Sequence, residues 1–261
     1  MKKNNILQGD LHITKPNFFI VGAPRSGTTS MYNYLKTHPD IFMSDYKEPW
    51  YFGSDIKCEF RPSLKDYLNY FSKAKNEKRI GEASSIYLCS TQAAKEIKKF
   101  NSLARIIIML RNPVDFLHSF HAKNLVIGLE DITDFETALK AEEARKQGLT
   151  SIPKKAEVAP ISLHYREMAK FSEQVERYFD IFGKENVFVI IHDDFKENTL
   201  KVYQDTLHFL DVHTDFRTDF PTGNRNTRLR SKLLNHLCII PDIPPKHNRS
   251  VPARILVKLC K

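Results

Sequence analysis

The chain is predicted to fold as an α/β domain with a central parallel sheet of about five strands and helices on both faces. Residues 18–21, 105–110 and 187–191 are short apolar runs of the kind that parallel sheets bury on both faces. A predicted helix follows each run. Strands and helices that alternate in this way form parallel sheets, which bind ligands beyond the carboxyl ends of their strands.

Length and composition favour one domain. The chain has 261 residues, of which 41% are apolar, and this is ample for a core. No Gly/Ser-rich or Pro-rich linker, internal repeat or low-complexity tract interrupts the pattern between residues 18 and 210. We expect a single domain over residues 1–261, with an N-terminal extension (1–16), a core (17–220) and a basic C-terminal segment (221–261).

The formal net charge of +9 suits a protein that binds a polyanion, such as nucleic acid, an anionic membrane surface or a multiply charged nucleotide. The aromatic-interleaved basic motifs of RNA-binding folds are not evident, so no nucleic-acid partner is expected. The four cysteines form no C-x-x-C pair, which suggests neither a metal site nor a redox motif. The N-terminus lacks an apolar signal region and no stretch approaches the ~20 apolar residues of a membrane span, so we expect a soluble, cytoplasmic protein.

The first predicted strand leads into a glycine turn and a hydroxyl-rich helix start. Residues 22–27 begin and end with glycine and contain one arginine, and four hydroxyl side chains lie within residues 26–30. Unpaired amides and the positive end of the helix dipole favour phosphate or sulfate at such a place. An ordinary strand–turn–helix is the simpler alternative. The prediction is an oxyanion site made of Arg25, Ser26, Gly27, Thr28, Thr29 and Ser30.

The spacing of Gly22 and Gly27 matches the Walker A frame of nucleotide triphosphatases. However, Thr28 stands where those enzymes need a lysine to reach the β- and γ-phosphates, which argues against hydrolysis of ATP or GTP. The cation is instead Arg25, inside the loop, where a planar guanidinium can hold two oxygens of a tetrahedral oxyanion.

Residues 29–36 are expected to form the helix after the loop, with an apolar stripe at helical spacing, and His38-Pro39 ends it. A short apolar segment follows at residues 41–43. Glu48 then arrives within one crossover of the loop, and a doubly wound sheet can bring such a residue back to the strand ends. A carboxylate beside a basic loop can act as a general base; a surface Lys47–Glu48 pair is the alternative.

The run at 105–110 ends in Arg111, and Asn112-Pro113 starts a helix with proline in its first turn. Ser119 therefore lies about two turns along that helix, where it and Arg111 could meet one phosphate. A strand-terminating arginine and an exposed serine are the alternative.

Later segments complete the pattern. An amphipathic helix is expected near residues 67–71, further helices over 135–146 and 164–182, and a polar loop over 148–160 that could cover an acceptor cleft. A helix from about residue 199 to 210 would be capped by Asp193-Asp194. The turn-rich stretch 222–232 contains Arg225 and Arg228, which could cover a phosphate or an acidic acceptor, or could form a solvated basic loop.

Residues 23–30, Ala-Pro-Arg-Ser-Gly-Thr-Thr-Ser, resemble the 5′-phosphosulfate loop of the sulfotransferases that use 3′-phosphoadenosine 5′-phosphosulfate (PAPS). Residues 47–52 are similar to the Lys-Glu-Pro-x-Phe-Phe stretch of the carbohydrate-acting members, and residues 81–88 to their Gly-Glu-x-Ser/Thr-Pro-x-Tyr-Leu segment. Arg111-Asn112-Pro113 with Ser119 looks like the family's 3′-phosphate motif. The resemblance extends, more weakly, to about residue 230.

The resemblance implies a three-layer P-loop sulfotransferase fold. It also implies transfer of a sulfuryl group from PAPS to an acceptor hydroxyl of a carbohydrate or glycoconjugate, with adenosine 3′,5′-bisphosphate (PAP) as product and no metal. Glu48 would be the base and Arg25 the second catalytic residue, while Lys47, Ser84 and Tyr87 would contact the acceptor. The donor would be held by the loop residues listed above together with Arg111, Ser119, Arg225 and Arg228.

The chain departs from the family pattern in two places. Several glycan-modifying relatives place a catalytic lysine where Ala83 stands here, and Ser85 replaces a proline, so no lysine role is expected in this segment. His118 and His121 are not assigned as bases, because they lie outside the segment in which the small-molecule branch carries its histidine. The rival functions are a nucleotide or sugar kinase-like P-loop phosphotransferase and a non-catalytic nucleic-acid-binding protein.

Overall fold

The computed structural model describes residues 14–58, 61–216 and 218–220. All five of its described strands are parallel and form one sheet in the order β2-β3-β1-β4-β5. The strands are β1 (Phe18–Gly22), β2 (Ile41–Met43), β3 (Arg79–Ala83), β4 (Arg105–Leu110) and β5 (Val187–Ile191). The chain leaves β1 toward one edge of the sheet and leaves β4 toward the other, so the topological switch point lies between these two strands.

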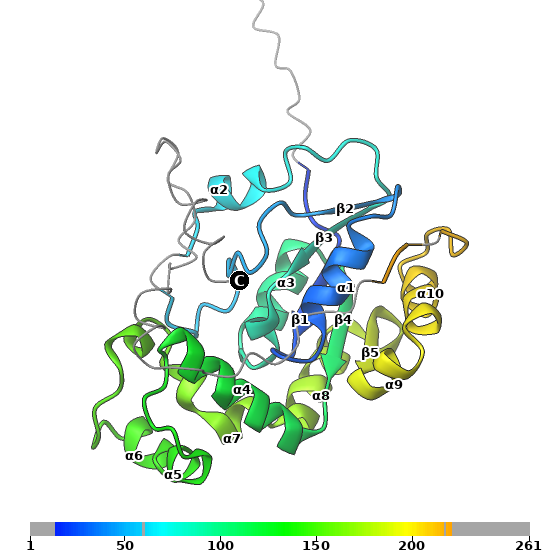
Figure 1. Ribbon diagram of the computed structural model, residues 1–261. Coiled ribbons are helices and arrows are strands. Elements are labelled where there is room, and N and C mark those ends of the chain that lie inside the picture. The colour runs from blue at the N-terminus through cyan, green and yellow to red at the C-terminus, as the bar shows by residue number, and fades with distance from the viewer. Residues whose placement is uncertain (1–13, 59–60, 217, 221–261) are drawn as a thin grey trace, which may run out of the picture.

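Helices cover both faces of the sheet (Figure 1). On one face Phe18 and Ile20 of β1 pack with α1 (Thr28–Leu35), α9 (His192–Glu197) and α10 (Thr199–Phe209). On the other, Phe19 and Val21 pack with α3 (Ala93–Phe100) and α8 (Phe171–Phe182). Successive side chains of a strand point to opposite faces, which is why four consecutive apolar residues supply two cores. The predicted three-layer α/β fold is confirmed.

The remaining elements surround this framework. They are α2 (Leu64–Asn69), α4 (Pro113–Ile127), α5 (Phe135–Lys140), α6 (Glu142–Lys146), α7 (Tyr165–Met168) and the short 3₁₀ helices η1 (Ser85–Leu88), η2 (Lys154–Val158), η3 (Pro160–Leu163) and η4 (Lys184–Asn186). Asn112 caps α4 by accepting a hydrogen bond from the backbone N–H of Val114 (3.0 Å), and Pro113 occupies the first turn, as predicted.

β3 was not predicted as a strand, because Arg79 and Glu82 break its apolar pattern. It lies between β1 and β2, and residue 81 must be glycine there. A Cβ on Gly81 would come within 2.2 Å of the Phe18 ring, so only a residue without a side chain lets the two strands pair.

Three predicted features differ from the structure. The helix predicted over 135–146 is divided at Ala141 into α5 and α6. The helix predicted over 164–182 breaks after α7, where the side-chain amide of Gln174 donates to the Glu167 carbonyl (2.9 Å) and takes the place of the next helical bond. Asp193-Asp194 does not cap α10; Asn198 does, by accepting from the Lys201 N–H (3.0 Å), whereas both aspartates lie in the first turn of α9.

Within the described ranges, no helix is long and apolar enough to cross a bilayer, and no group of three or more His, Cys, Asp or Glu residues could hold a metal ion. Cys58 and Cys89 are free thiols. Cys238, Cys260 and the predicted basic C-terminal segment lie outside the described residues.

Candidate active site at the carboxyl edge of the sheet

The loop after β1 turns through two residues in the left-handed region, Arg25 (φ 61°) and Gly27 (φ 93°). Gly27 is the N-cap residue of α1, and no described side chain caps the helix there. A Cβ on Gly27 would meet Met109 Cε at 3.2 Å and His192 Cδ2 at 3.3 Å, so a glycine fits both the conformation and the space. No described side chain caps the amides at the start of α1, which is where the oxyanion site is predicted.

The hydroxyl groups of this loop are not equivalent. Ser26 is fully buried, and its hydroxyl lies 3.4 Å from the Pro24 carbonyl, while Thr28 is only 5% exposed. Thr29 is exposed and Ser30 is half-buried. An anion at this helix start would thus meet the backbone N–H groups and the hydroxyls of Thr29 and Ser30, whereas Ser26 contributes to the shape of the turn.

Arg25 joins the loop to α4. Its Nε donates to Ser119 Oγ at 3.0 Å, so the two predicted donor-binding motifs are in direct contact. Burial, and then the nearby guanidinium of Arg111, lower the pKa of Arg25. The Arg111 side chain lies at the end of β4 with Nη2 3.7 Å from the Asp115 carboxylate. Two cations held close together at a helix N-terminus are an arrangement that an oxyanion would stabilise.

Glu48 lies at the end of β3, where its N–H donates to the Ala83 carbonyl (2.9 Å). Glu48 (φ 62°) and Trp50 (φ 52°) both adopt the left-handed region, which is strained for residues other than glycine and often marks functional segments. The Glu48 carboxylate accepts four hydrogen bonds, from Lys47 Nζ (2.7 Å), Trp50 Nε1 (3.0 Å), and the N–H and hydroxyl of Ser85 (2.8 Å each).

These donors determine the charge of Glu48. Burial alone would raise its pKa, but the ammonium of Lys47 and the hydrogen bonds from Lys47, Trp50 and Ser85 outweigh burial, and the pKa lies below its usual value. Glu48 is therefore a carboxylate at neutral pH, with its side chain 28% exposed. Lys47 pairs with Glu48 at 2.7 Å, and its predicted contact with an acceptor stays a prediction. The replacement of proline by Ser85 adds two hydrogen bonds to the carboxylate.

Lys123 is a site residue that the sequence analysis missed. It lies four residues after Ser119 on α4, hence one turn further along the same face. Lys123 keeps much of its surface exposed, and the pKa of its ammonium is lowered, most by desolvation and then by Arg25 and Lys47, while Glu48 opposes the decrease. The ammonium is therefore within electrostatic range of all three. Its position four residues after Ser119 is the sequence feature from which it could have been predicted.

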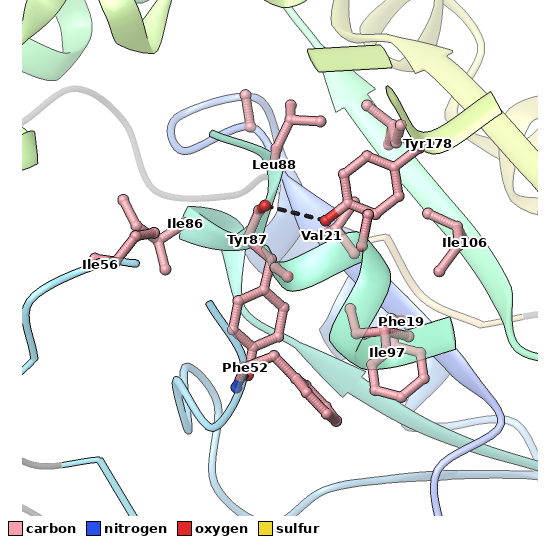
Figure 2. Packing of buried hydrophobic residues seen from close by; sticks show 14 of the residues in the cluster. Phe19, Val21, Phe52, Ile56, Ile86, Tyr87, Leu88, Ile97, Ile106 and Tyr178 are labelled. Atoms are coloured by element: carbon pink, nitrogen blue, oxygen red, sulfur yellow. Dashed lines mark hydrogen bonds between the residues drawn. The ribbon is translucent and has the colours of Figure 1, made fainter. Parts of the chain in front are cut away.

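The side chains of Ser84 and Tyr87, which are predicted to contact the acceptor, are buried and hydrogen-bonded within the protein. The Ser84 hydroxyl is buried and accepts from the Trp50 N–H (3.3 Å). The Tyr87 ring is fully buried beside Phe52, its hydroxyl accepts from the Phe52 N–H (3.2 Å), and its carbonyl accepts from the Tyr178 hydroxyl (3.0 Å; Figure 2). Their side chains instead fix the backbone that follows Glu48.

A second carboxyl group, Glu82, lies under the site and was also missed. It is fully buried, and burial raises its pKa to about 7, although the Tyr67 hydroxyl donates to Oε2 at 2.5 Å. Glu48 adds to the increase through charge repulsion. Because Glu82 gains a proton more easily than Glu48, the two carboxyl groups carry different charges near neutral pH.

The two histidines beside Ser119 face away from the loop. The His121 Nε2 atom lies 2.9 Å from the Ile132 carbonyl, and the His118 ring lies 4.2 Å from the ring of Phe135. Both therefore pack against the chain that leads into α5, which agrees with their exclusion as bases. Arg225 and Arg228, predicted to bind the donor, lie outside the described residues.

The predicted cover loop at 148–160 borders a cavity of about 430 Å³, through Pro160. Ile56, Cys89 and Arg177 line the same cavity. None of the predicted site residues lines it, so this cavity is separate from the cluster around Arg25 and Glu48.

The comparisons with known proteins agree with this geometry. The family model described as the sulfotransferase domain matches residues 15–228. The crystal structure of a sulfotransferase from Alicyclobacillus acidocaldarius is 32% identical, covers 82% of this chain and 87% of that chain, and superposes with a TM-score of 0.71.

Two curated relatives match smaller parts of the chain. The membrane-associated sulfotransferase kil1 of Dictyostelium discoideum is 36% identical over 100 residues, which are 38% of this chain and 21% of that protein. Human carbohydrate sulfotransferase 15 is 32% identical over 147 residues, covering 40% of this chain and 26% of that protein. Each match thus spans about a quarter or less of the curated relative.

Proposed function

Because the chain belongs to the sulfotransferase domain family, we propose that it transfers a sulfuryl group from PAPS to a hydroxyl group of a carbohydrate or glycoconjugate. The observation that carries the proposal is the contact between Arg25 and Ser119, which joins the predicted anion-binding loop to α4, the helix that follows β4. One ligand with two anionic groups would suit both places. PAPS carries a phosphosulfate at one end and a 3′-phosphate at the other.

On the donor side, Arg25 and the first amides of α1 would hold the phosphosulfate, and Arg111 with Ser119 the 3′-phosphate. The charge that develops on the leaving phosphate lies closest to Arg25, so this guanidinium can stabilise the transition state as well as the bound donor. Transfer of a sulfuryl group parallels phosphoryl transfer, in which catalysis is mainly positioning and stabilisation of charge.

On the acceptor side, Glu48 would take the proton of the acceptor hydroxyl. The acceptor oxygen forms a new bond to sulfur while the bond from sulfur to the 5′-phosphate oxygen breaks, which leaves PAP and a sulfate ester. Since Glu48 already accepts four hydrogen bonds, one of these must be exchanged for the acceptor hydroxyl. Lys47 pairs with this carboxylate, and Lys123 interacts with it through its charge.

A carbohydrate acceptor is proposed on two grounds. The segment around Glu48 resembles that of the carbohydrate-acting members, and one relative is named carbohydrate sulfotransferase 15. The cytoplasmic location stays a prediction from the sequence; another relative is named a membrane-associated sulfotransferase.

A thermal-shift panel tests the proposal against its two rivals. PAP should raise the melting temperature, whereas ATP and RNA should not, because only PAP has a group for each anion site. Stabilisation by ATP without PAP would instead support a phosphotransferase, and stabilisation by RNA alone a nucleic-acid-binding protein. A mass-spectrometric screen for products heavier by one sulfate, with PAPS as donor, would then identify the acceptor.

A further inference from the structure

Two residues meet at the carboxyl ends of neighbouring strands. β4 and β5 are paired, with Leu110 opposite Ile191, so the next residue of each strand, Arg111 and His192, leaves the sheet at the same level. The His192 ring also packs against the loop, with Cδ2 3.3 Å from the position of a Cβ on Gly27. His192 therefore contacts the loop and neighbours Arg111, although the motifs of the sequence do not include it.

Both side chains bury a nitrogen atom without a hydrogen-bond partner in the described part of the chain: Nε of Arg111 and Nδ1 of His192. The closest carboxylate to His192 Nδ1 belongs to Asp193 at 3.9 Å, which is too far for a hydrogen bond. Buried polar atoms in folded proteins are usually paired. Two such nitrogens at neighbouring strand ends indicate a place where a bound ligand group would form hydrogen bonds with both.

The charges around His192 keep it neutral without a ligand. Its side chain is 14% exposed, and burial, then Lys196 and Arg111, lower its pKa to about 4, while Asp193 and Asp115 oppose the decrease. Gly27, the loop residue against which the ring packs, is uncharged. At neutral pH the imidazole is thus uncharged near the guanidinium of Arg111, whose side chain is 16% exposed.

We propose that His192 takes up a proton from solvent when the 3′-phosphate of the donor nucleotide binds beside Arg111, and that the imidazolium becomes the second cation of this subsite. The inference rests on the proposed function, because it requires Arg111 to hold a phosphate. An opposite charge within a few ångströms would bring the pKa of His192 from about 4 into the range of about 5 to 7. Binding and protonation then favour each other, so His192 contributes more to donor affinity as the pH falls through this range.

Calorimetry of PAP binding at about pH 6, in two buffers with different ionisation enthalpies, measures the proton uptake directly. We compare the wild type with His192→Gln, because glutamine keeps a polar side chain of similar reach but cannot be protonated. The wild type should take up more protons than His192→Gln, by about 0.1 to 0.9 proton per nucleotide at this pH for a bound pKa of about 5 to 7. Protons exchanged by the nucleotide's own phosphate are common to both proteins and cancel. His208→Gln, at an exposed histidine of α10, should match the wild type.

Equal proton uptake by the wild type and His192→Gln, with PAP still bound, would overturn this inference and leave the proposed function intact. Failure of the wild type to bind PAP would overturn the proposed function itself. A second measurement does not depend on the variant: the imidazole of His192 in the wild type is titrated by nuclear magnetic resonance with and without PAP. The midpoint should move to higher pH with PAP, and an unchanged midpoint would contradict the proposal.

Discussion

The donor side and the acceptor side of the site differ in how their polar groups are paired. On the donor side, nitrogens of Arg111 and His192 are buried without partners among the described residues. On the acceptor side, the Glu48 carboxylate accepts four hydrogen bonds from Lys47, Trp50 and Ser85. A ligand on the donor side therefore adds hydrogen bonds to groups that have none within the described ranges, whereas an acceptor must replace one of the four hydrogen bonds to Glu48.

Because of this difference, substitutions on the donor side and on the acceptor side should change different quantities: nucleotide affinity in the first case and turnover in the second. Donor-side groups are already placed, so their removal should weaken nucleotide binding. Acceptor-side groups must rearrange before the reaction, so their removal should change turnover and its pH dependence more than nucleotide affinity. The substitutions below test this separation in order of expected effect.

Glu48→Gln should lower kcat by about 10²–10⁴ and leave PAP affinity nearly unchanged, because an amide keeps the shape but cannot accept the proton. Steady-state kinetics with PAPS and calorimetry with PAP measure the two effects. Glu136→Gln, at an exposed carboxylate of α5, is the matched control. If Glu48→Gln keeps most of its activity across the pH range, the base is another residue.

Arg111→Ala should weaken PAP by about 2–4 kcal/mol but adenosine 5′-monophosphate hardly at all, since only PAP carries the 3′-phosphate. Ser119→Ala should also weaken PAP more than adenosine 5′-monophosphate, by a smaller amount. In the structure the Ser119 hydroxyl also accepts a hydrogen bond from Arg25. Calorimetric titration of both nucleotides measures this. An equal loss for the two nucleotides would remove Arg111 from the 3′-phosphate subsite.

Arg25→Ala should weaken the donor and slow turnover together, because Arg25 would contact oxygens that are charged in both the ground state and the transition state. A lost charged hydrogen bond costs roughly 1.5–3 kcal/mol, so affinity should fall at least about tenfold. Unchanged donor affinity would place Arg25 outside the donor site and would contradict the division into two sides.

Ser85→Ala should have the smallest effect. It removes the hydroxyl bond to Glu48 but keeps the backbone N–H, so the pKa of Glu48, which these donors lower, should rise toward its usual value. Protonated Glu48 cannot act as a base, so the acid limb of kcat/KM should move to higher pH by up to about one unit. Ser102→Ala, at an exposed serine, is the control. An unchanged acid limb would mean that Ser85 does not adjust this carboxylate.

The elements that carry the proposed donor side were predicted from the sequence better than those of the proposed acceptor side, for a physical reason. The anion loop and the strand that ends in Arg111 are short local patterns: an apolar run, a turn and a helix start. Arg225 and Arg228 lie outside the described residues, so their predicted role stays untested. The family, and the fold with its five parallel strands, are confirmed by the structure and the comparisons.

The acceptor side depends on contacts between distant residues. Ser85 reaches Glu48 across 37 positions, and Tyr67 reaches Glu82 across 15. A motif can place Tyr87 near an acceptor, but only the packing of the whole core shows that its ring is buried. β3 was missed for the same reason, because its polar residue Glu82 is paired only after the chain folds.

The central claim is that the donor side holds a nucleotide by two separate anionic groups. Calorimetric titration of the wild type with PAP and with adenosine 5′-monophosphate tests it most directly, because the two ligands differ only in the 3′-phosphate. The account predicts that PAP binds tighter by about 2–4 kcal/mol, or at least about thirtyfold. Equal affinity of the two nucleotides would contradict it.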